Sequence, residues 1–423
     1  MIKVDEALKI ILSAVKQVES ENIPLIESLG RVLSEDIHAG SDIPGFDNSA
    51  MDGYAVRFSD TTNASKVKPK TLEVICDIKA GDSPKASLKE NQAARIMTGA
   101  IIPRGADSVI MVEDTERVSG NRYQVTGKRG KEWVRVFKEV KLGENIRKKG
   151  EDIKKGELVI PGGKELNSAH IGILASLGMS SIKVYRKPRV AILATGDEVI
   201  EIDKELATGK LRNSNTYTLY SQILKCGAIP KNLGIAKDKP DQLEKSIRKG
   251  LDCDIILTSG GVSVGDYDLV KDILAKMGTN IKFWKVAMRP GKPLVFGTIK
   301  NESRSCVQGR DKLIFGLPGN PVSSMISFEV FVRPAILNMM SQIHDERKEV
   351  DAVLEEDIVK KKGLRYYLRA YTHWKNGVYL TRTTGPQGSG ILKSMALANS
   401  LIILPEEEEK IEKGVRVTVR FLD

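Results

Sequence analysis

The sequence predicts a multidomain α/β plus β protein built around a doubly wound α/β domain. Its length of 423 residues exceeds what one ordinary hydrophobic core supports. From Pro188 to about residue 338, apolar strand-like runs alternate with helical stretches, which is typical of a largely parallel sheet. Before and after this region the chain changes to short alternating strands, which predict smaller β-rich domains.

The elements before Pro188 are a helix, a set of short strands and a second helix. Apolar residues recur at helical spacing over 4–15, as in an amphipathic helix. From about 70 to 146, alternating strands are separated by Gly and Asp, which indicates a small β-rich domain. A helix then begins near Asn167 or Ser168, either of which could cap it.

The elements after Pro188 alternate between strand and helix. Strand-like segments include "RVAILATGDE", "CDIILTSGG" and "KLIFGL", and helical segments include "SNTYTLYSQILKCG", "KPDQLEKSIRKGL" and "YDLVKDILAKMG". From about 350 the strands "YYLRAYTHW", "GVYLTRTT", "SLIILPEE" and "VRVTVRFL" predict a small β-barrel or sandwich.

Composition and charge narrow the class of partner. The formal net charge of +11 favours anionic molecules. Lysine and arginine are scattered and form no aromatic-basic motif, so we expect no nucleic-acid partner. No run approaches the roughly 18 apolar residues of a membrane span, and the first helix does not have the pattern of a signal peptide. We therefore expect a cytoplasmic protein with no membrane partner.

The four cysteines and four histidines argue against a zinc site. The cysteines are far apart without a CxxC pair, and the histidines stand singly. We expect reduced, mostly buried thiols. A metal ion would then be held by carboxylate and phosphate oxygens, which are ligands that Mg²⁺ prefers.

Four loops leave strands of the predicted sheet and carry polar residues. Ligands of doubly wound sheets bind outside the carboxyl ends of the strands, so we expect these loops to meet. The loops are "ATGDE" with Thr195, Gly196, Asp197 and Glu198; "TSGGVSVGDYD" with Ser259, Gly260, Gly261, Ser263 and Asp266; "MRPGKP" with Arg289 and Lys292; and "LPGNPVSS" with Pro318, Gly319 and Asn320.

The loop chemistry suits a phosphorylated, anionic small molecule. Glycines allow backbone N–H groups to reach phosphate oxygens, two cations neutralise charge, and carboxylates can hold Mg²⁺ between phosphates. Each glycine turn or charge alone is more often structural, but four such loops on one edge favour a binding site. The chain has no GxGxxG after its first strand and no GxxxxGK[ST], which argues against dinucleotide folds and P-loop NTPases.

Further unusual segments lie outside this sheet. "DIPGFDNSAMDGYAVR" places Asp42, Asp47 and Asp52 five apart in a turn-rich stretch. "RIMTGA" places Thr98 at a strand end, and "TTGPQGSG" places Ser389 in a glycine-rich loop.

At these residues the sequence resembles a known family. "PGFDNSAMDGYA", "IMTGA", "GENIRKKGEDI", "ATGDE", "SGGVSVGDYD", "MRPGKP", "LPGNPVSS" and "GPQGSG" occur in the order seen in molybdopterin molybdenumtransferases, the MoeA and gephyrin E-domain family. The resemblance spans nearly the whole chain. It implies insertion of molybdate, or tungstate, into adenylylated molybdopterin with release of AMP and with Mg²⁺ as the cation.

The resemblance also implies an assembly and a domain order. The assembly is a homodimer whose active cleft is shared between subunits, served by a molybdopterin adenylyltransferase and by acceptor apoenzymes. The domains are a linking domain of residues 1–45 and 147–181, an inserted β-rich domain of 46–146, an α/β molybdopterin-binding domain similar to MogA of 182–338, and a C-terminal β-barrel of 339–423.

Position by position, the resemblance implies the site residues. The catalytic residues are Asp52, Thr98, Asp152, Glu198 and Asp266, of which Asp52, Glu198 and Asp266 are also the metal ligands. The substrate-binding residues are Thr195, Gly196, Ser259, Gly260, Gly261, Ser263, Arg289, Lys292, Pro318, Gly319, Asn320, Arg369 and Ser389. Departing oxo groups need protons, so one of the acids could serve as a general acid.

Two other functions remain open at this stage. Molybdopterin adenylyltransferases share the α/β domain, but they are small and end this loop in "SGGTG", which Val262 and Ser263 interrupt here. A cofactor-binding scaffold is the second, because gephyrin's related domain clusters receptors and a fold alone does not prove catalysis. No residue distinguishes molybdate from tungstate.

Overall fold

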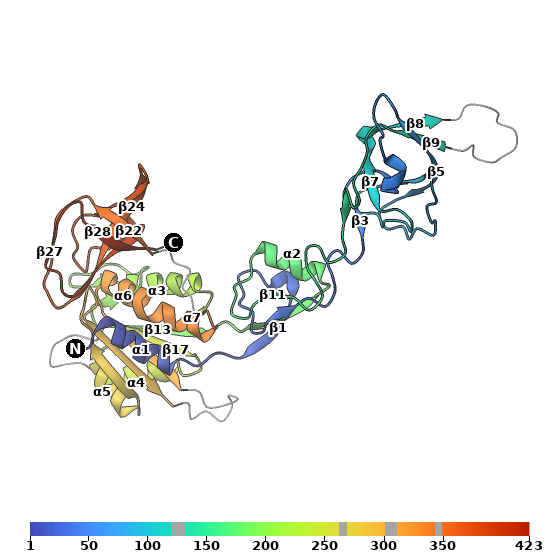
Figure 1. The fold of residues 1–423 in the computed structure, drawn as a ribbon. Coiled ribbons are helices and arrows are strands. Elements are labelled where there is room, and N and C mark those ends of the chain that lie inside the picture. Colours follow the sequence, from blue (N-terminus) through green and yellow to red (C-terminus); the bar gives the residue numbers. More distant parts are fainter. Residues whose placement is uncertain (120–131, 262–268, 301–310, 343–348, 423) are drawn as a thin grey trace. The chain divides into compact units, whose positions relative to one another are not determined.

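A computed structural model describes residues 1–119, 132–261, 269–300, 311–342 and 349–422 (Figure 1). These residues form two compact units. The first comprises residues 1–35, 162–167 and 181–423, and the second comprises 36–161 and 168–180. Both segments assigned to a linking domain are divided between the units, so the four-domain division stays a prediction. Among the described residues, no helix has the length and apolar character needed to cross a membrane.

The first unit contains a six-stranded sheet with helices on both faces (Figure 1). Its order is β16 (Ile229–Ala236), β13 (Arg189–Thr195), β17 (Ile255–Ser259), β21 (Lys312–Leu317), β20 (Pro293–Ile299) and β18 (Asn280–Lys285). The first four strands are parallel, whereas β20 and β18 run antiparallel to their neighbours. Three parallel carboxyl ends, those of β13, β17 and β21, therefore lie side by side.

Side-chain alternation along β13 explains the two helical layers. Val190 and Ile192 face a core shared with α1 (Val4–Ala14), α3 (Ser214–Lys225), α6 (Pro321–Ser327) and α7 (Arg333–Met339). Ala191 and Leu193 face a second core shared with α4 (Pro240–Arg248) and α5 (Leu269–Lys276). The predicted doubly wound α/β fold is confirmed.

The C-terminal part of the first unit is a closed barrel. Its strands are β24 (Arg365–Lys375), β25 (Val378–Thr383), β22 (Glu349–Leu354), β28 (Arg416–Phe421) and β26 (Ser400–Leu404). The pairing of β24 with β26 closes the circle. A short strand, β19 (Met288–Arg289), adds to β24 from the α/β part and brings Arg289 opposite Tyr366. The predicted barrel is confirmed.

The second unit is built on another six-stranded sheet. Its order is β7 (Ser108–Met111), β4 (Gly53–Val56), β6 (Gln92–Ile96), β5 (Lys70–Ile78), β9 (Glu132–Val136) and β8 (Thr115–Ser119). The helix expected near Asn167 or Ser168 is α2 (Ser168–Ser176). Gly53 is required at the start of β4, because a Cβ there would collide with the carbonyl of Ile110 on β7.

Candidate functional site

The carboxyl ends of the parallel strands open onto a cavity of about 720 Å³. All four loops expected to meet at this edge contribute to the lining, although "MRPGKP" does so only through Pro293 and not through Arg289 or Lys292. The predicted site residues that line the cavity are Thr195, Glu198, Ser259, Gly260, Gly261, Pro318, Gly319 and Asn320. Gly196 lies against the carboxylate of Glu198, since a Cβ on Gly196 would lie 2.6 Å from Oε2 of Glu198.

The two glycines after β17 are required by packing as well as by any ligand. Gly260 and Gly261 have φ of +98° and +68°, in the left-handed region that favours glycine. A Cβ on Gly260 would lie 2.5 Å from the carbonyl oxygen of Thr195, and a Cβ on Gly261 would lie 2.6 Å from Cγ2 of Val270. The loop therefore passes close to the end of β13, and Thr195, Gly260 and Gly261 all line the cavity.

An asparagine that was not among the predicted site residues joins two of these loops. The Nδ2 of Asn215 donates to Oγ of Ser259 and to the carbonyl of Gly319, both at 2.8 Å. Asn213, two residues earlier, caps α3 by accepting the backbone N–H of Thr216 at 3.1 Å. Both asparagines line the cavity. The sequence "RNSN" at the start of this helix, close to the carboxyl edge of the sheet, is the signal that could have indicated these two asparagines.

The connection between β13 and α3 adds one acid and one missed cation to the cavity. β14 (Val199–Ile200) pairs with β15 (Leu211–Arg212), and this pairing keeps Glu198 and Arg212 in the cavity lining. Both side chains are exposed. A mixed-charge rim of this kind can contact an anion and a bound cation together.

Among the described residues that line this cavity, Glu198 is the one carboxylate that could bind Mg²⁺. Burial raises the pKa of Asp238 above its ordinary value; a hydrogen bond with Asp197 opposes this shift, and the negative charges of Asp197 and Glu198 add to it. Across the described ranges, no three His, Cys, Asp or Glu side chains are grouped to hold a metal. Mg²⁺ often binds through one or two carboxylates plus substrate phosphates, and Glu198 fits that mode as a single protein ligand.

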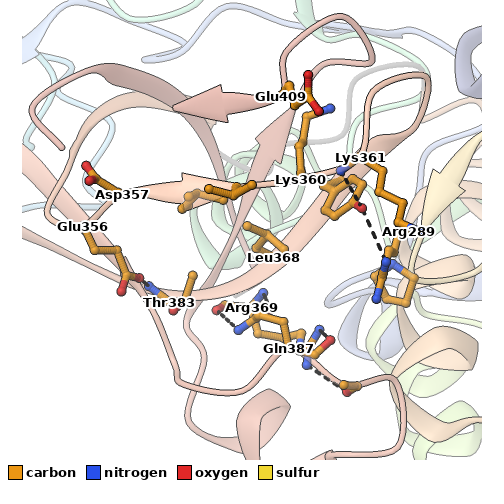
Figure 2. A pocket seen from close by; sticks show the side chains of 15 residues that line it. Arg289, Glu356, Asp357, Lys360, Lys361, Leu368, Arg369, Thr383, Gln387 and Glu409 are labelled. Atoms are coloured by element: carbon orange, nitrogen blue, oxygen red, sulfur yellow. Dashed lines mark hydrogen bonds between the residues drawn. The ribbon is translucent and has the colours of Figure 1, made fainter. Parts of the chain in front are cut away.

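A second cavity of about 690 Å³ lies beside the barrel (Figure 2). Arg289 lines it, and the Arg289 Cζ lies 5.7 Å from the ring centre of Tyr366. Nζ of Lys360 lies 5.1 Å from the same ring, so Tyr366 contacts two cations. Arg369 also belongs to the wall of this cavity, but its side chain is fully buried.

The remaining predicted residues of the first unit are placed separately. Lys292 is exposed and lines neither of these two cavities; its carbonyl accepts the backbone N–H of Val286 at 3.0 Å. Ser389 accepts the backbone N–H of Val322 at 3.1 Å through its carbonyl. Ser263 and Asp266 lie outside the described residues. Of the predicted substrate-binding residues, seven therefore line the cavity at the sheet edge, Arg289 and Arg369 line the second cavity, and Gly196, Lys292 and Ser389 belong to neither lining.

In the second unit, Asp52 and Thr98 form one hydrogen-bonded pair. The backbone N–H and the Oγ1–H of Thr98 both donate to Oδ1 of Asp52, each at 2.7 Å. These two bonds, the backbone one first, hold the pKa of Asp52 below its ordinary value. Asp52 is exposed and stays ionised, which suits a ligand of a cation better than a proton donor.

Two of the other predicted acids of the second unit accept hydrogen bonds that stabilise loops. Asp47 accepts the backbone N–H of Lys149 at 2.8 Å and the ammonium of Lys148 at 2.9 Å. Asp42 accepts the backbone N–H of Lys155 at 2.9 Å. Of the three equally spaced acids, Asp42 and Asp47 therefore have a structural role in these loops. Asp152 is exposed.

Comparisons with known proteins cover the chain almost completely. Family profiles match residues 2–178 as the MoeA N-terminal region (domain I and II), 191–338 as a probable molybdopterin binding domain, and 351–422 as the MoeA C-terminal region (domain IV). The chain is 38% identical to a molybdopterin molybdenumtransferase of Bacillus subtilis, covering 100% of this chain and 94% of that protein. It is 35% identical to one of Haemophilus influenzae, covering 99% and 98%.

Solved structures agree with these matches. A molybdopterin biosynthesis MoeA protein from Pyrococcus horikoshii OT3 superposes with a TM-score of 0.81 at 31% identity. The superposition covers 100% of both chains.

Proposed function

The chain belongs to the MoeA family of molybdopterin molybdenumtransferases, and we propose that it inserts molybdate into adenylylated molybdopterin with release of AMP. It is thus a transferase of molybdenum cofactor biosynthesis. In this proposal tungstate is the alternative oxyanion to molybdate.

The observation that carries the proposal is the cavity at the ends of β13, β17 and β21. Its volume of about 720 Å³ falls within the range of small-molecule sites, which is roughly 300–1,000 Å³. The backbone of Gly260 and Gly261 lines it, and the amide groups there can approach phosphate oxygens closely. Arg212 adds a cation to the rim.

The chain's own residues suggest a division of roles. The glycine loop and Arg212 bind the phosphates, and Asn215 keeps the loop and the turn at Gly319 in register. Mg²⁺, when bound, supplies positive charge at the phosphates, and Glu198 is the described residue of this cavity that would hold it. Arg289 attracts the incoming oxyanion from the second cavity.

The acids have different protonation properties in this scheme. Asp52 remains a carboxylate, because Thr98 hydrogen-bonds its ionised form. Asp238, whose pKa is raised, lies beside Asp197 and does not belong to the cavity lining, so it has no role in this scheme. Asp52, Thr98 and Asp152 would act in a cleft shared between the subunits of a homodimer.

The family resemblance also suggests a location, an assembly and partners for this protein. We propose a cytoplasmic homodimer of four-domain subunits that receives substrate from a molybdopterin adenylyltransferase and passes product to acceptor apoenzymes. The match of family profiles to almost the full length supports the domain order in this proposal.

AMP release from adenylylated molybdopterin tests the proposed reaction. The wild-type protein is incubated with Mg²⁺, with and without molybdate, beside Glu198→Gln. We expect release that depends on molybdate and falls at least tenfold in the variant, since a neutral amide holds Mg²⁺ poorly. Release without any oxyanion would indicate simple phosphoanhydride hydrolysis. Pyrophosphate release from ATP would instead support adenylyl transfer, and no release with molybdate or tungstate would favour a scaffold.

A further inference from the structure

Arg289 of the α/β part lies against an aromatic residue of the barrel. β19 pairs in parallel with β24, and this pairing brings Arg289 opposite Tyr366. The Arg289 Cζ lies 5.7 Å from the centre of the Tyr366 ring, within the range of a cation–π interaction. Nη1 of the same guanidinium donates a long hydrogen bond of 3.5 Å to the Tyr366 hydroxyl, marked by a dashed line in Figure 2. Both the ring and the hydroxyl therefore contact the guanidinium.

Tyr366 is itself fixed in this position. Its exposed fraction is 6%, and it belongs to the same buried cluster of the barrel as Leu368 and Leu404. Its hydroxyl accepts the backbone N–H of Lys361 at 3.1 Å. A hydroxyl oxygen has two lone pairs, so it can accept this bond and the bond from Arg289 together. The tyrosine is thus a rigid surface for a long and otherwise flexible arginine side chain.

Tyr366 orders Arg289 without cancelling its charge. Within the described ranges, no carboxylate forms an ion pair with Arg289, and the residue is exposed in the cavity of about 690 Å³. A ligand that must order a side chain with many rotamers loses binding free energy, so a side chain ordered beforehand binds more tightly. Because the aromatic ring is uncharged, the positive charge of Arg289 is left for an anion.

The second cation on the same ring is already used by a loop. Nζ of Lys360 lies 5.1 Å from the ring centre and donates to the carbonyl of Leu364 at 3.0 Å. Lys360 is only 4% exposed, and this burial lowers its pKa. Of the two cations on the Tyr366 ring, Arg289 is therefore the one that an anion in the cavity reaches more easily.

We infer that Tyr366 is a positioning residue that acts on the oxyanion through Arg289. It fixes the direction of the guanidinium in the cavity of about 690 Å³, so that the charge is in place before molybdate arrives. The inference rests on the proposed function in so far as molybdate enters this cavity. The contact between Tyr366 and Arg289 is present in the free protein and is measured there.

Two substitutions separate the ring from the hydroxyl. Tyr366→Phe keeps the ring and loses the hydroxyl, whereas Tyr366→Met loses both and retains an unbranched apolar side chain that can fill the space in the barrel core. Tyr371→Leu is the matched control. Tyr371 lies on the same strand, is exposed, and stacks on His373 instead of on a cation.

Side-chain NMR signals of Arg289 in the free protein are the primary measurement. Labelling of arginine with ¹³C and ¹⁵N reveals these signals, and Arg289→Lys identifies them by their loss. In wild type and in Tyr366→Phe we expect upfield ring-current shifts and nuclear Overhauser effects to the aromatic ring. The upfield shift should disappear in Tyr366→Met and persist in Tyr371→Leu. Because the Overhauser effects are observed in the wild type, the test stands even where Tyr366→Met does not fold.

The KM for molybdate in the AMP-release assay measures the consequence. We expect Tyr366→Met to raise this KM about three- to tenfold, the size of a cation–π contribution, with kcat nearly unchanged. Tyr366→Phe should raise it less than about threefold, because only a long hydrogen bond is lost. In the background of Arg289→Met, Tyr366→Met should raise KM little further, since the two residues act as one unit.

Two outcomes would overturn the inference. In the first, the wild type shows neither the upfield shift nor the Overhauser effects, so that the ring does not hold the guanidinium. In the second, Tyr366→Met raises KM equally with and without Arg289, which would show that Tyr366 acts on the substrate independently. Absence of molybdate-dependent AMP release in the wild type would refute the proposed reaction, while the NMR data would still decide whether Tyr366 positions Arg289.

Discussion

Asn215 donates a hydrogen bond of 2.8 Å to the Oγ of Ser259, and so ties the first turn of α3 to the end of β17. The same Nδ2 donates to the carbonyl of Gly319, 104 residues further along the chain. Carbonyl oxygens only accept hydrogen bonds, so this contact requires an amide nitrogen at position 215. One side chain thereby fixes the relative position of two loops of the cavity.

Asn215→Asp should destabilise the loops that line the cavity, because a carboxylate cannot donate to the Gly319 carbonyl and places negative charge against it. We expect a loss of about 1–3 kcal/mol in the free energy of unfolding, measured in urea, and a higher KM for adenylylated molybdopterin. Asn22→Asp, an exposed position on β1 (Ser20–Pro24), makes the same charge change and should alter neither quantity. Equal behaviour of the two variants would contradict the bridging role.

Gly260→Ala and Gly319→Ala should differ sharply although both sit in glycine turns of the cavity. A Cβ at Gly260 meets the Thr195 carbonyl at 2.5 Å with φ of +98°, whereas a Cβ at Gly319 has its nearest neighbour, Cα of Gly260, at 3.6 Å. We expect Gly260→Ala to cost roughly 2 kcal/mol or more in thermal or urea unfolding and Gly319→Ala to cost little. Loss of substrate affinity in a fully stable Gly319→Ala would indicate that this turn contacts the ligand directly.

Arg186→Met should destabilise the first unit in a pH-dependent way. Arg186 binds both carboxylate oxygens of Asp254 at 2.8 and 2.7 Å. Burial alone would raise the pKa of Asp254, but the hydrogen bonds from Arg186 and the Arg189 N–H outweigh it and lower that pKa. A lowered pKa stabilises the fold above the ordinary pKa of Asp, about 3.9, and this contribution disappears as pH falls through the folded value.

We therefore expect Arg186→Met to cost about 3 kcal/mol at neutral pH, with the difference from wild type shrinking as the solution is acidified. Unfolding in urea at a series of pH values measures this. Arg189→Met is the control, since Arg189 and its partner Asp252 are both about half exposed, at 46% each, and the pair should contribute little at any pH. A pH-independent loss in Arg186→Met would contradict the ionic origin.

Thr98→Val should shift the acidic limb of the pH–activity profile to higher pH. Removal of the hydroxyl leaves Asp52 with only the backbone N–H of Thr98, so its pKa rises toward the ordinary value and the carboxylate is lost at a higher pH. Thr98→Ser retains the hydroxyl and should keep the wild-type profile. Profiles of kcat/KM for AMP release provide the measurement, and an unshifted limb in Thr98→Val would argue against Asp52 as the group that titrates.

Local patterns were sufficient for the fold class and for the edge of the sheet that holds the cavity. The continuous apolar run along β13 and the helices between parallel strands predict two covered faces, and loops at parallel carboxyl ends must meet on one edge. Motif order was sufficient for the family. These features are encoded within a few residues, or in segments read in sequence, so they need no knowledge of long-range contacts.

Only the tertiary structure decided which side chains share a cavity. Asn215 meets Gly319, and Ser389 meets Val322, through contacts between residues far apart in the chain. The side chain of Arg369 donates hydrogen bonds to acceptors that follow it by 17 to 25 residues. The type of a residue determines which hydrogen bonds it can make. The packing of segments that are distant in the sequence determines which partners it contacts. For this reason the roles of these residues could not be predicted from the sequence alone.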